Sequence, residues 1–141
     1  MKPHLVAIAM VLTGTAVLAA DAPKQSGQQL LSTKVTASGQ EITPPEGPLQ
    51  VTATLSELAP GESTVLHKHP YLRYDYVLEG TLSVTNFDTG KTDVVTAGQF
   101  VVDPINQWHQ GKAIDGKRVR LLIIDQTPIG KSNLILKDAG K

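Results

Sequence analysis

The alternation of apolar and polar positions after residue 48 is typical of short β-strands. Runs rich in Val, Leu, Ile and Thr are separated by turn residues such as Pro60-Gly61 and Asp115-Gly116. The runs are LQVTATLSEL (49–58), STVLHKH (63–69), YDYVLEG (74–80), TLSVTNF (81–87), KTDVVTA (91–97), QFVVD (99–103) and RVRLLIID (118–125). Several short strands at this spacing predict an all-β sandwich or barrel, and no trustworthy helical period follows residue 24.

The two ends of the chain differ from this central part. Lys2 precedes an uncharged stretch from Leu5 to Ala20, which is the layout of a secretory signal peptide over residues 1–20. An uncleaved N-terminal anchor is the alternative. Residues 21–48 form a lead-in with an expected first strand at 29–37. Residues 49–127 form the barrel, and 128–141 form a tail in which 134–136 is a candidate edge strand.

Composition narrows the classes of protein. The 13 basic and 13 acidic residues balance, so no patch predicts nucleic-acid binding. There is no cysteine, which excludes thiolate metal sites and thiol chemistry. With the signal peptide, we expect an exported protein, periplasmic or secreted, that is not stably inserted in a membrane after cleavage.

The histidines are concentrated in the barrel. His4 lies in the expected signal peptide, so the mature chain keeps His67, His69 and His109. Residues i and i+2 of a strand point to the same face, so His67 and His69 can hold one ion from one side. His109 follows about 40 residues later, which is enough chain for two hairpins and a return to the same interior. Three imidazoles predict a divalent metal site with open positions.

The spacing of these histidines resembles the two motifs of the cupins. The first cupin motif is Gly, five residues, His-x-His, three or four residues, Glu, six residues, Gly. This chain has Gly61, His67, His69 and Gly80 in the matching places. The second is Gly, five residues, Pro-x-Gly, two residues, His, three residues, Asn. Its positions carry Gly98, Pro104, Asn106 in place of Gly, His109, and Ala113 in place of Asn.

The resemblance covers roughly residues 49–125 and implies a double-stranded β-helix, the jelly-roll barrel of the cupins. It also implies a homodimer. In support, Tyr74, Tyr76 and Leu78 alternate with Arg73, Asp75 and Val77, and they form a face apolar enough to need cover.

One position departs from the family. The first-motif glutamate falls at position 73, where this chain has Arg73. A guanidinium about 6 Å from a divalent ion would repel it by roughly 5 kcal/mol at an effective dielectric near 20. Three interpretations stay open: Arg73 binds an anionic substrate that also touches the metal, it forms an ion pair with Asp75 or Asp103, or its side chain points away from the metal.

Without the glutamate, the three histidines resemble the three-histidine metal sites of some cupin dioxygenases. We therefore expect one divalent metal ion (Fe, Mn, Ni, Cu or Zn) and a small-molecule ligand. Arg73, Tyr71 and Trp108 are candidate substrate-binding residues, and no catalytic residue is assigned. Three classes stay open: a metal-dependent oxygenase acting on a small anionic substrate, a non-catalytic ligand-binding protein, and a structural module.

Overall fold

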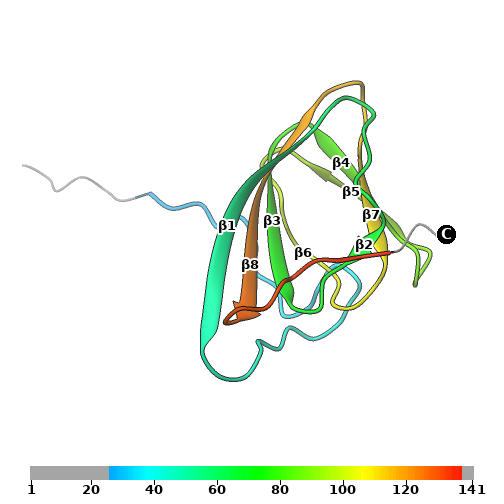
Figure 1. Cartoon of the computed structure of the whole chain (residues 1–141). Coiled ribbons are helices and arrows are strands. Elements are labelled where there is room, and N and C mark those ends of the chain that lie inside the picture. The colour runs from blue at the N-terminus through cyan, green and yellow to red at the C-terminus, as the bar shows by residue number, and fades with distance from the viewer. Residues whose placement is uncertain (1–25, 138–141) are drawn as a thin grey trace, which may run out of the picture.

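The computed structural model describes residues 26–137, and these form two antiparallel β-sheets facing each other (Figure 1). One sheet has the strand order β1-β8-β3-β6, and the other has the order β5-β4-β7-β2-β9. The strands are β1 (Leu49–Leu58), β2 (His67–Lys68), β3 (Leu72–Glu79), β4 (Thr81–Asn86), β5 (Thr92–Thr96), β6 (Phe100–Val102), β7 (His109–Ala113), β8 (Val119–Pro128) and β9 (Ile135–Leu136). The predicted all-β jelly-roll barrel is confirmed.

Each of the seven predicted runs contains a strand, and the differences are local. The run at 63–69 forms only the two-residue strand β2, flanked by single bridges from Ser63 to Lys112 and from His69 to Ile105. The candidate edge strand in the tail is present as β9, which pairs with β2.

The strand expected at 29–37 is wrong. Only one bridge, between Val35 and Glu41, forms there. At the end of this segment, the backbone N–H of Ala37 donates to the carbonyl oxygen of Val102 at 2.9 Å. Nearby, the side-chain amide of Gln40 both donates to and accepts from the backbone of Ile105, at 2.8 Å each. The predicted signal peptide lies outside the described residues. Within residues 26–137, no helix could span a membrane.

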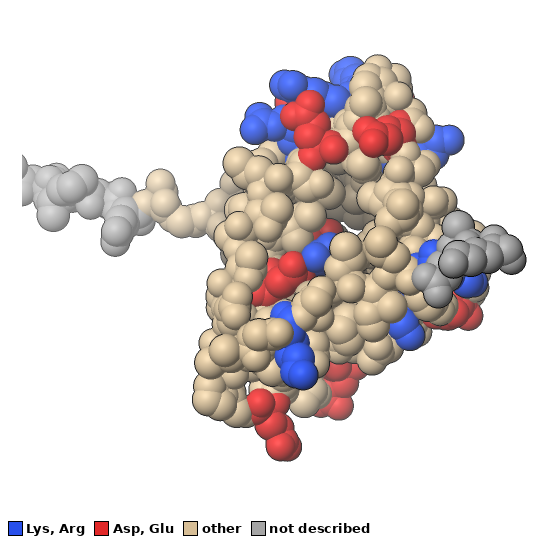
Figure 2. All heavy atoms as spheres, in the orientation of Figure 1, with Lys and Arg blue, Asp and Glu red and all other residues tan. Residues whose placement is uncertain are grey.

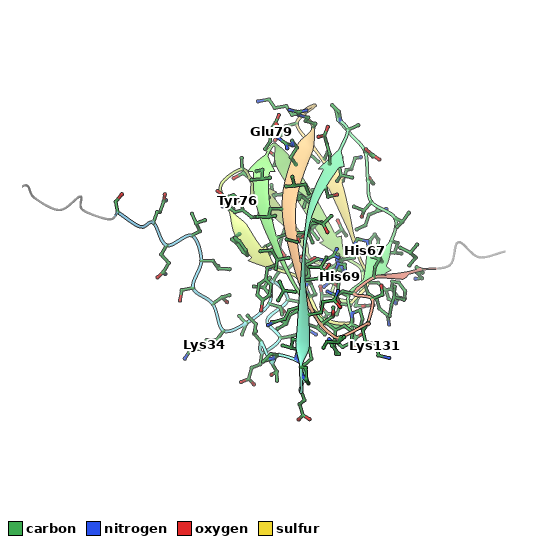
Figure 3. All side chains as sticks on the ribbon, turned by 60° about the vertical axis from the view of Figure 1, so that its left-hand side comes forward. Lys34, His67, His69, Tyr76, Glu79 and Lys131 are labelled. Carbon is green, nitrogen blue, oxygen red and sulfur yellow. The ribbon has the colours of Figure 1, made fainter. Side chains whose placement is uncertain are left out.

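Apolar side chains fill one end of the barrel. The buried cluster consists of Leu58, Val77, Leu82, Val95, Ala113, Val119 and Leu121. It lies toward the turn between β3 and β4, whereas His67 and His69 lie inside the barrel nearer the opposite end (Figure 3). The barrel therefore divides into a packed apolar end and a polar end.

Two tight turns require unusual backbone conformations. Gly80, between β3 and β4, has a φ of 83°, and a Cβ there would lie 2.1 Å from the carbonyl oxygen of Arg118. Only glycine fits this position. Asn106 has a φ of 56°, and asparagine tolerates this left-handed region better than most residues. It therefore takes the place of the second-motif glycine without loss of the turn.

The outer face of the β1-β8-β3-β6 sheet is apolar. Ser56, Arg73, Asp75 and Ile123 line the interior of the barrel, so the alternate positions of β1, β3 and β8 point outward. The outward positions of these three strands include Val51, Leu55, Tyr74, Tyr76, Leu122 and Ile124, which are neighbours in the strand register. Val51 and Leu55 are 64% and 65% exposed. The sequence pattern predicted that Tyr74 and Tyr76 lie on an apolar face, and both lie on this outer face.

Candidate metal centre

The three predicted metal-ligating histidines come together inside the barrel. His67 on β2 is directly opposite His109 on β7, and His69 follows β2 by one residue. The ring centroids are 4.6 to 4.9 Å apart, and the residues are 7%, 0% and 2% exposed for His67, His69 and His109. His67 and His69 lie close together in Figure 3. The expected return of the chain after two hairpins brings the third imidazole to the first two.

Each imidazole is oriented by the backbone. The Nδ1 atoms lie 2.7, 2.7 and 2.9 Å from the carbonyl oxygens of Val65, Asn133 and Gln107, for His67, His69 and His109 respectively. A carbonyl oxygen only accepts, so each Nδ1 carries the proton. In a neutral imidazole the lone pair is then on Nε2. Carbonyl partners of this kind fix the tautomer and orientation of metal-binding histidines.

The cluster fits a divalent metal ion. One nitrogen of each ring lies within 4.8 Å of the others. Nε2 of His69 and Nε2 of His109 are buried and have no hydrogen-bond partner among the described residues. Buried acceptors without partners are costly unless a ligand satisfies them. The three histidines could therefore hold one ion.

Asp103 adds a carboxylate to this cluster. Its Oδ2 lies 3.3 Å from Nε2 of His69 and 3.7 Å from Nε2 of His109, and the residue is 6% exposed. Asp103 directly follows β6, and its backbone N–H donates to the carbonyl oxygen of Arg73 at 3.0 Å. The sequence offers Asp103 as a candidate ion-pair partner of Arg73 and as one of the few carboxyl groups near the histidines. Its place just before Pro104 of the second motif was the available signal.

The protonation of the cluster follows from burial and from the carboxylate. Burial, which disfavours the charged form, lowers the pKa of His67 to about 4. Burial acts in the same direction on His109, but the carboxylate of Asp103 outweighs it and raises the pKa of His109. For Asp103, burial alone would raise the pKa; the imidazoles of His109 and His69 outweigh this and hold the pKa well below its usual range.

Arg73 pairs with a residue that the sequence did not suggest. Its Nε and Nη2 each lie 2.8 Å from an oxygen of Asp125, in a bidentate ion pair. Position 125 is directly opposite position 73 in the β3–β8 register. The expected partners Asp75 and Asp103 are therefore wrong, although an ion pair does form. Since the pairing of β3 with β8 joins positions 52 residues apart, only the topology reveals this partner.

Asp75 is the third carboxyl of the interior. It is 6% exposed, and its Oδ1 has no hydrogen-bond partner within the described residues. Burial raises its pKa well above the usual value, and the nearby charge of Asp103 adds to the effect, while Arg73 opposes it. Asp75 therefore holds its proton more strongly than an exposed aspartate.

A cavity of about 200 Å³ adjoins the cluster. Polar residues of its wall include His67, His109, Asp103, Arg73 and Asp75. Apolar residues of its wall include Leu58, Leu82, Leu121, Ile123 and Leu134. Figure 2 shows a hollow on the molecular face, with acidic and basic atoms recessed beside it. A small ligand in this cavity would meet both imidazoles and charged groups.

Two candidate substrate-binding residues lie elsewhere. Neither Tyr71 nor Trp108 lines this cavity. The ring of Trp108 instead faces the ammonium groups of Lys68 and Lys137, 4.9 and 5.6 Å from its centroid. Tyr71 contributes its backbone N–H, which donates to the side-chain oxygen of Asn133 at 2.8 Å.

The C-terminal tail completes the site, which the sequence did not indicate. It crosses one end of the barrel from β8 to β2 (Figure 1). Asn133, buried in this tail, accepts from His69 through its carbonyl oxygen. Its side-chain amide donates to Asp125 at 2.6 Å and to the carbonyl oxygen of Leu72 at 3.2 Å. One residue therefore links a histidine of the cluster to the Arg73–Asp125 pair.

Known proteins are similar to this chain in sequence and fold. The chain matches an oxalate decarboxylase from Lactobacillus farciminis, solved as a formate complex, at 28% identity and a TM-score of 0.53 over 61% of this chain. It matches the polyketide cyclase RemF from Streptomyces resistomycificus at 27% identity and a TM-score of 0.51 over 62% of this chain. The chain covers 26% of the decarboxylase and 63% of the cyclase.

An oxalate oxidase in complex with the substrate analogue glycolate matches at 22% identity and a TM-score of 0.52, over 61% of this chain and 45% of that one; this likeness concerns the fold. No curated protein matches the sequence. The cupin domain model matches residues 54–125, which run from within β1 to within β8 and make up about half of the chain. The family match, the barrel and the two histidine motifs agree, and the chain belongs to the cupin family.

Proposed function

We propose that this protein binds one divalent metal ion through Nε2 of His67, His69 and His109, and binds a small ligand beside it. The observation that carries this proposal is the convergence of three buried imidazoles whose Nδ1 atoms are all held by carbonyl oxygens. That arrangement leaves the Nε2 lone pairs free and close together. A core without a metal would not need three acceptors in one place.

The chain's own residues support ligand binding in the adjoining cavity. Leu82, Leu121 and Ile123 contribute an apolar wall to the cavity. Arg73 also lines the cavity. Its Nε and Nη2 bind Asp125, and within residues 26–137 Nη1 has no hydrogen-bond partner. That nitrogen is available to a carboxylate.

The ligand we propose is a small carboxylate anion. A volume of about 200 Å³ is below the range of roughly 300–1,000 Å³ common for drug-sized ligands. The similar decarboxylase was solved with formate, a small carboxylate, while the similar cyclase is named for different chemistry. A bound divalent metal would polarise the ligand and, if redox-active, activate dioxygen. We therefore propose an oxygenase acting on a small carboxylate, outside the cytoplasm.

Metal analysis tests the first part. Protein purified without an affinity tag is stripped of metal, and its affinity for Zn²⁺ and Mn²⁺ is measured by calorimetry. One equivalent should bind. Each of His67→Ala, His69→Ala and His109→Ala should weaken binding by more than about 100-fold, since even loss of an outer partner costs 10–100-fold. Lys68→Ala, between two of the histidines but packed on Trp108, is the matched control.

Oxygen uptake tests the second part. The metal-stripped protein is loaded anaerobically with Fe²⁺ or Mn²⁺ and mixed with small carboxylates such as glycolate and oxalate. Uptake that depends on the carboxylate and is lost in Arg73→Met supports the oxygenase. Tight carboxylate binding with no oxygen uptake would favour the non-catalytic ligand-binding protein instead.

A further inference from the structure

We infer that Asp103 is a fourth ligand of the metal, supplying from β6 the carboxylate that position 73 on β3 lacks. The inference rests on the proposed metal site and extends its donor set from three nitrogens to three nitrogens and one oxygen. Nothing in the spacing of the two motifs assigns Asp103 this role.

The Nε2 atoms of His69 and His109 face the carboxylate of Asp103 at distances that a shared cation could bridge. Oδ2 of Asp103 lies 3.3 Å from Nε2 of His69, yet this Nε2 has no hydrogen-bond partner within the described chain. The same holds for Nε2 of His109, 3.7 Å away. Because each Nδ1 donates to a carbonyl oxygen, a neutral imidazole presents a lone pair at Nε2. When both imidazoles are neutral, a carboxylate and two lone pairs meet in a buried space, and such acceptors repel unless a cation lies among them. That cation is either a metal ion or a proton on an imidazole, and metal affinity distinguishes the two.

The backbone places Asp103 directly opposite position 73, at which the family has its glutamate. The β3–β6 register joins Tyr74 with Val102, and the backbone N–H of Asp103 donates to the carbonyl oxygen of Arg73. Position 103 is therefore next to position 73 on the neighbouring strand. Both Arg73 and Asp103 line the cavity that His67 and His109 also line. A carboxylate at position 103 therefore reaches the same part of the barrel interior as one at position 73 would.

The charges of the interior agree with this assignment. Arg73 is occupied by Asp125 in a bidentate pair, which leaves Asp103 free of the guanidinium. Asp103 then offsets one of the two charges of the ion. The repulsion between Arg73 and the metal is reduced by Asp125, so the arginine is compatible with a loaded site. A donor set of three imidazoles and one carboxylate suits Mn²⁺, Fe²⁺ or Zn²⁺.

Metal affinity of Asp103→Asn tests the inference, with Asp75→Asn as the matched control. Both aspartates line the cavity and are 6% exposed. Only the carboxylate of Asp103 lies within ion-pair distance of the histidine Nε2 atoms. Metal affinity is measured by calorimetry with Mn²⁺ and Zn²⁺ on metal-free protein. Asp103→Asn should bind more than about 30-fold more weakly than wild type, because losing a direct ligand costs more affinity than losing a residue that only supports a ligand. Asp75→Asn should stay within about threefold.

Binding by Asp103→Asn within threefold of wild type would overturn the inference and leave Asp103 as a hydrogen-bond partner of the histidines. Wild type that binds no metal would instead overturn the proposed function. If Asp103→Asn does not fold, infrared spectra of wild type labelled with ¹³C-carboxylate aspartate replace the variant. Metal should shift an aspartate carboxylate band in wild type and not in His67→Ala, and no shift in wild type would overturn the inference.

Discussion

Replacing Asp125 with asparagine tests whether the Arg73–Asp125 pair holds the interior together. The two side chains are 14% and 15% exposed and are joined by two contacts of 2.8 Å. Asparagine keeps the shape and one acceptor oxygen, so Asn133 can still donate to it. What is lost is the negative charge opposite a largely buried guanidinium.

The expected cost comes from the charge left behind. Removing one partner of a buried pair destabilises a protein by about 3–5 kcal/mol, because the remaining charge stays out of water without compensation. For a domain of this size, 1 kcal/mol corresponds to roughly 4 °C in melting temperature. Asp125→Asn should therefore lower the melting temperature of the metal-free protein by ~12–20 °C.

A double-mutant cycle separates the pair from the packing around it. Arg73→Met with Asp125→Asn removes both charges, so the double variant should be more stable than Asp125→Asn alone. Glu79→Gln is the control, because it breaks the exposed contact with Arg118 and should cause no measurable change. Urea unfolding of the four proteins gives the coupling. A double variant no more stable than Asp125→Asn would refute the reasoning.

Gly80→Ala should abolish folding or lower stability severely, because the new Cβ would collide with the carbonyl oxygen of Arg118. Gly90→Ala is the control, because Gly90 has a φ of 73° but open space around it. It should lower the free energy of unfolding in urea by only about 1 kcal/mol. In metal-free protein, Asp75→Asn should be more stable than wild type, by an amount that grows as the pH rises above 3.8. Above this pH the Asp75 carboxyl loses its proton in the unfolded chain, whereas burial keeps the proton in the folded state. The free energy of unfolding of wild type therefore falls with rising pH until the raised pKa of Asp75 is passed, and that of the variant does not. The protein should sediment as a homodimer at tens of micromolar, and a Val51→Lys, Leu55→Lys variant should sediment as a monomer; a wild-type monomer would contradict the role given to the apolar outer face. Protein isolated from its native host should begin near residue 21, and an intact mass that includes residue 1 would contradict the predicted signal peptide.

The strand content could be predicted from residue pattern because each element is short and bounded by its own turn residues. The same pattern failed at 29–37, where β-forming residues have only one bridge partner. Leu30 and Leu31 are exposed there, so extended pairing would gain little burial of apolar surface. Strand propensity without a neighbouring strand does not make a strand.

The chain by itself determined that His67 and His69 share a face, because the period of two along a strand is a local property. The return of a third imidazole, His109, was expected from the resemblance of the two motifs and from the length of chain between them. Only the tertiary structure decided which carboxylate meets which cation. Arg73 is joined to Asp125 across β3 and β8, and Asp103 is turned toward the histidines at the end of β6. These partners lie far apart in sequence, and their contacts depend on strand order and register, which no local pattern encodes.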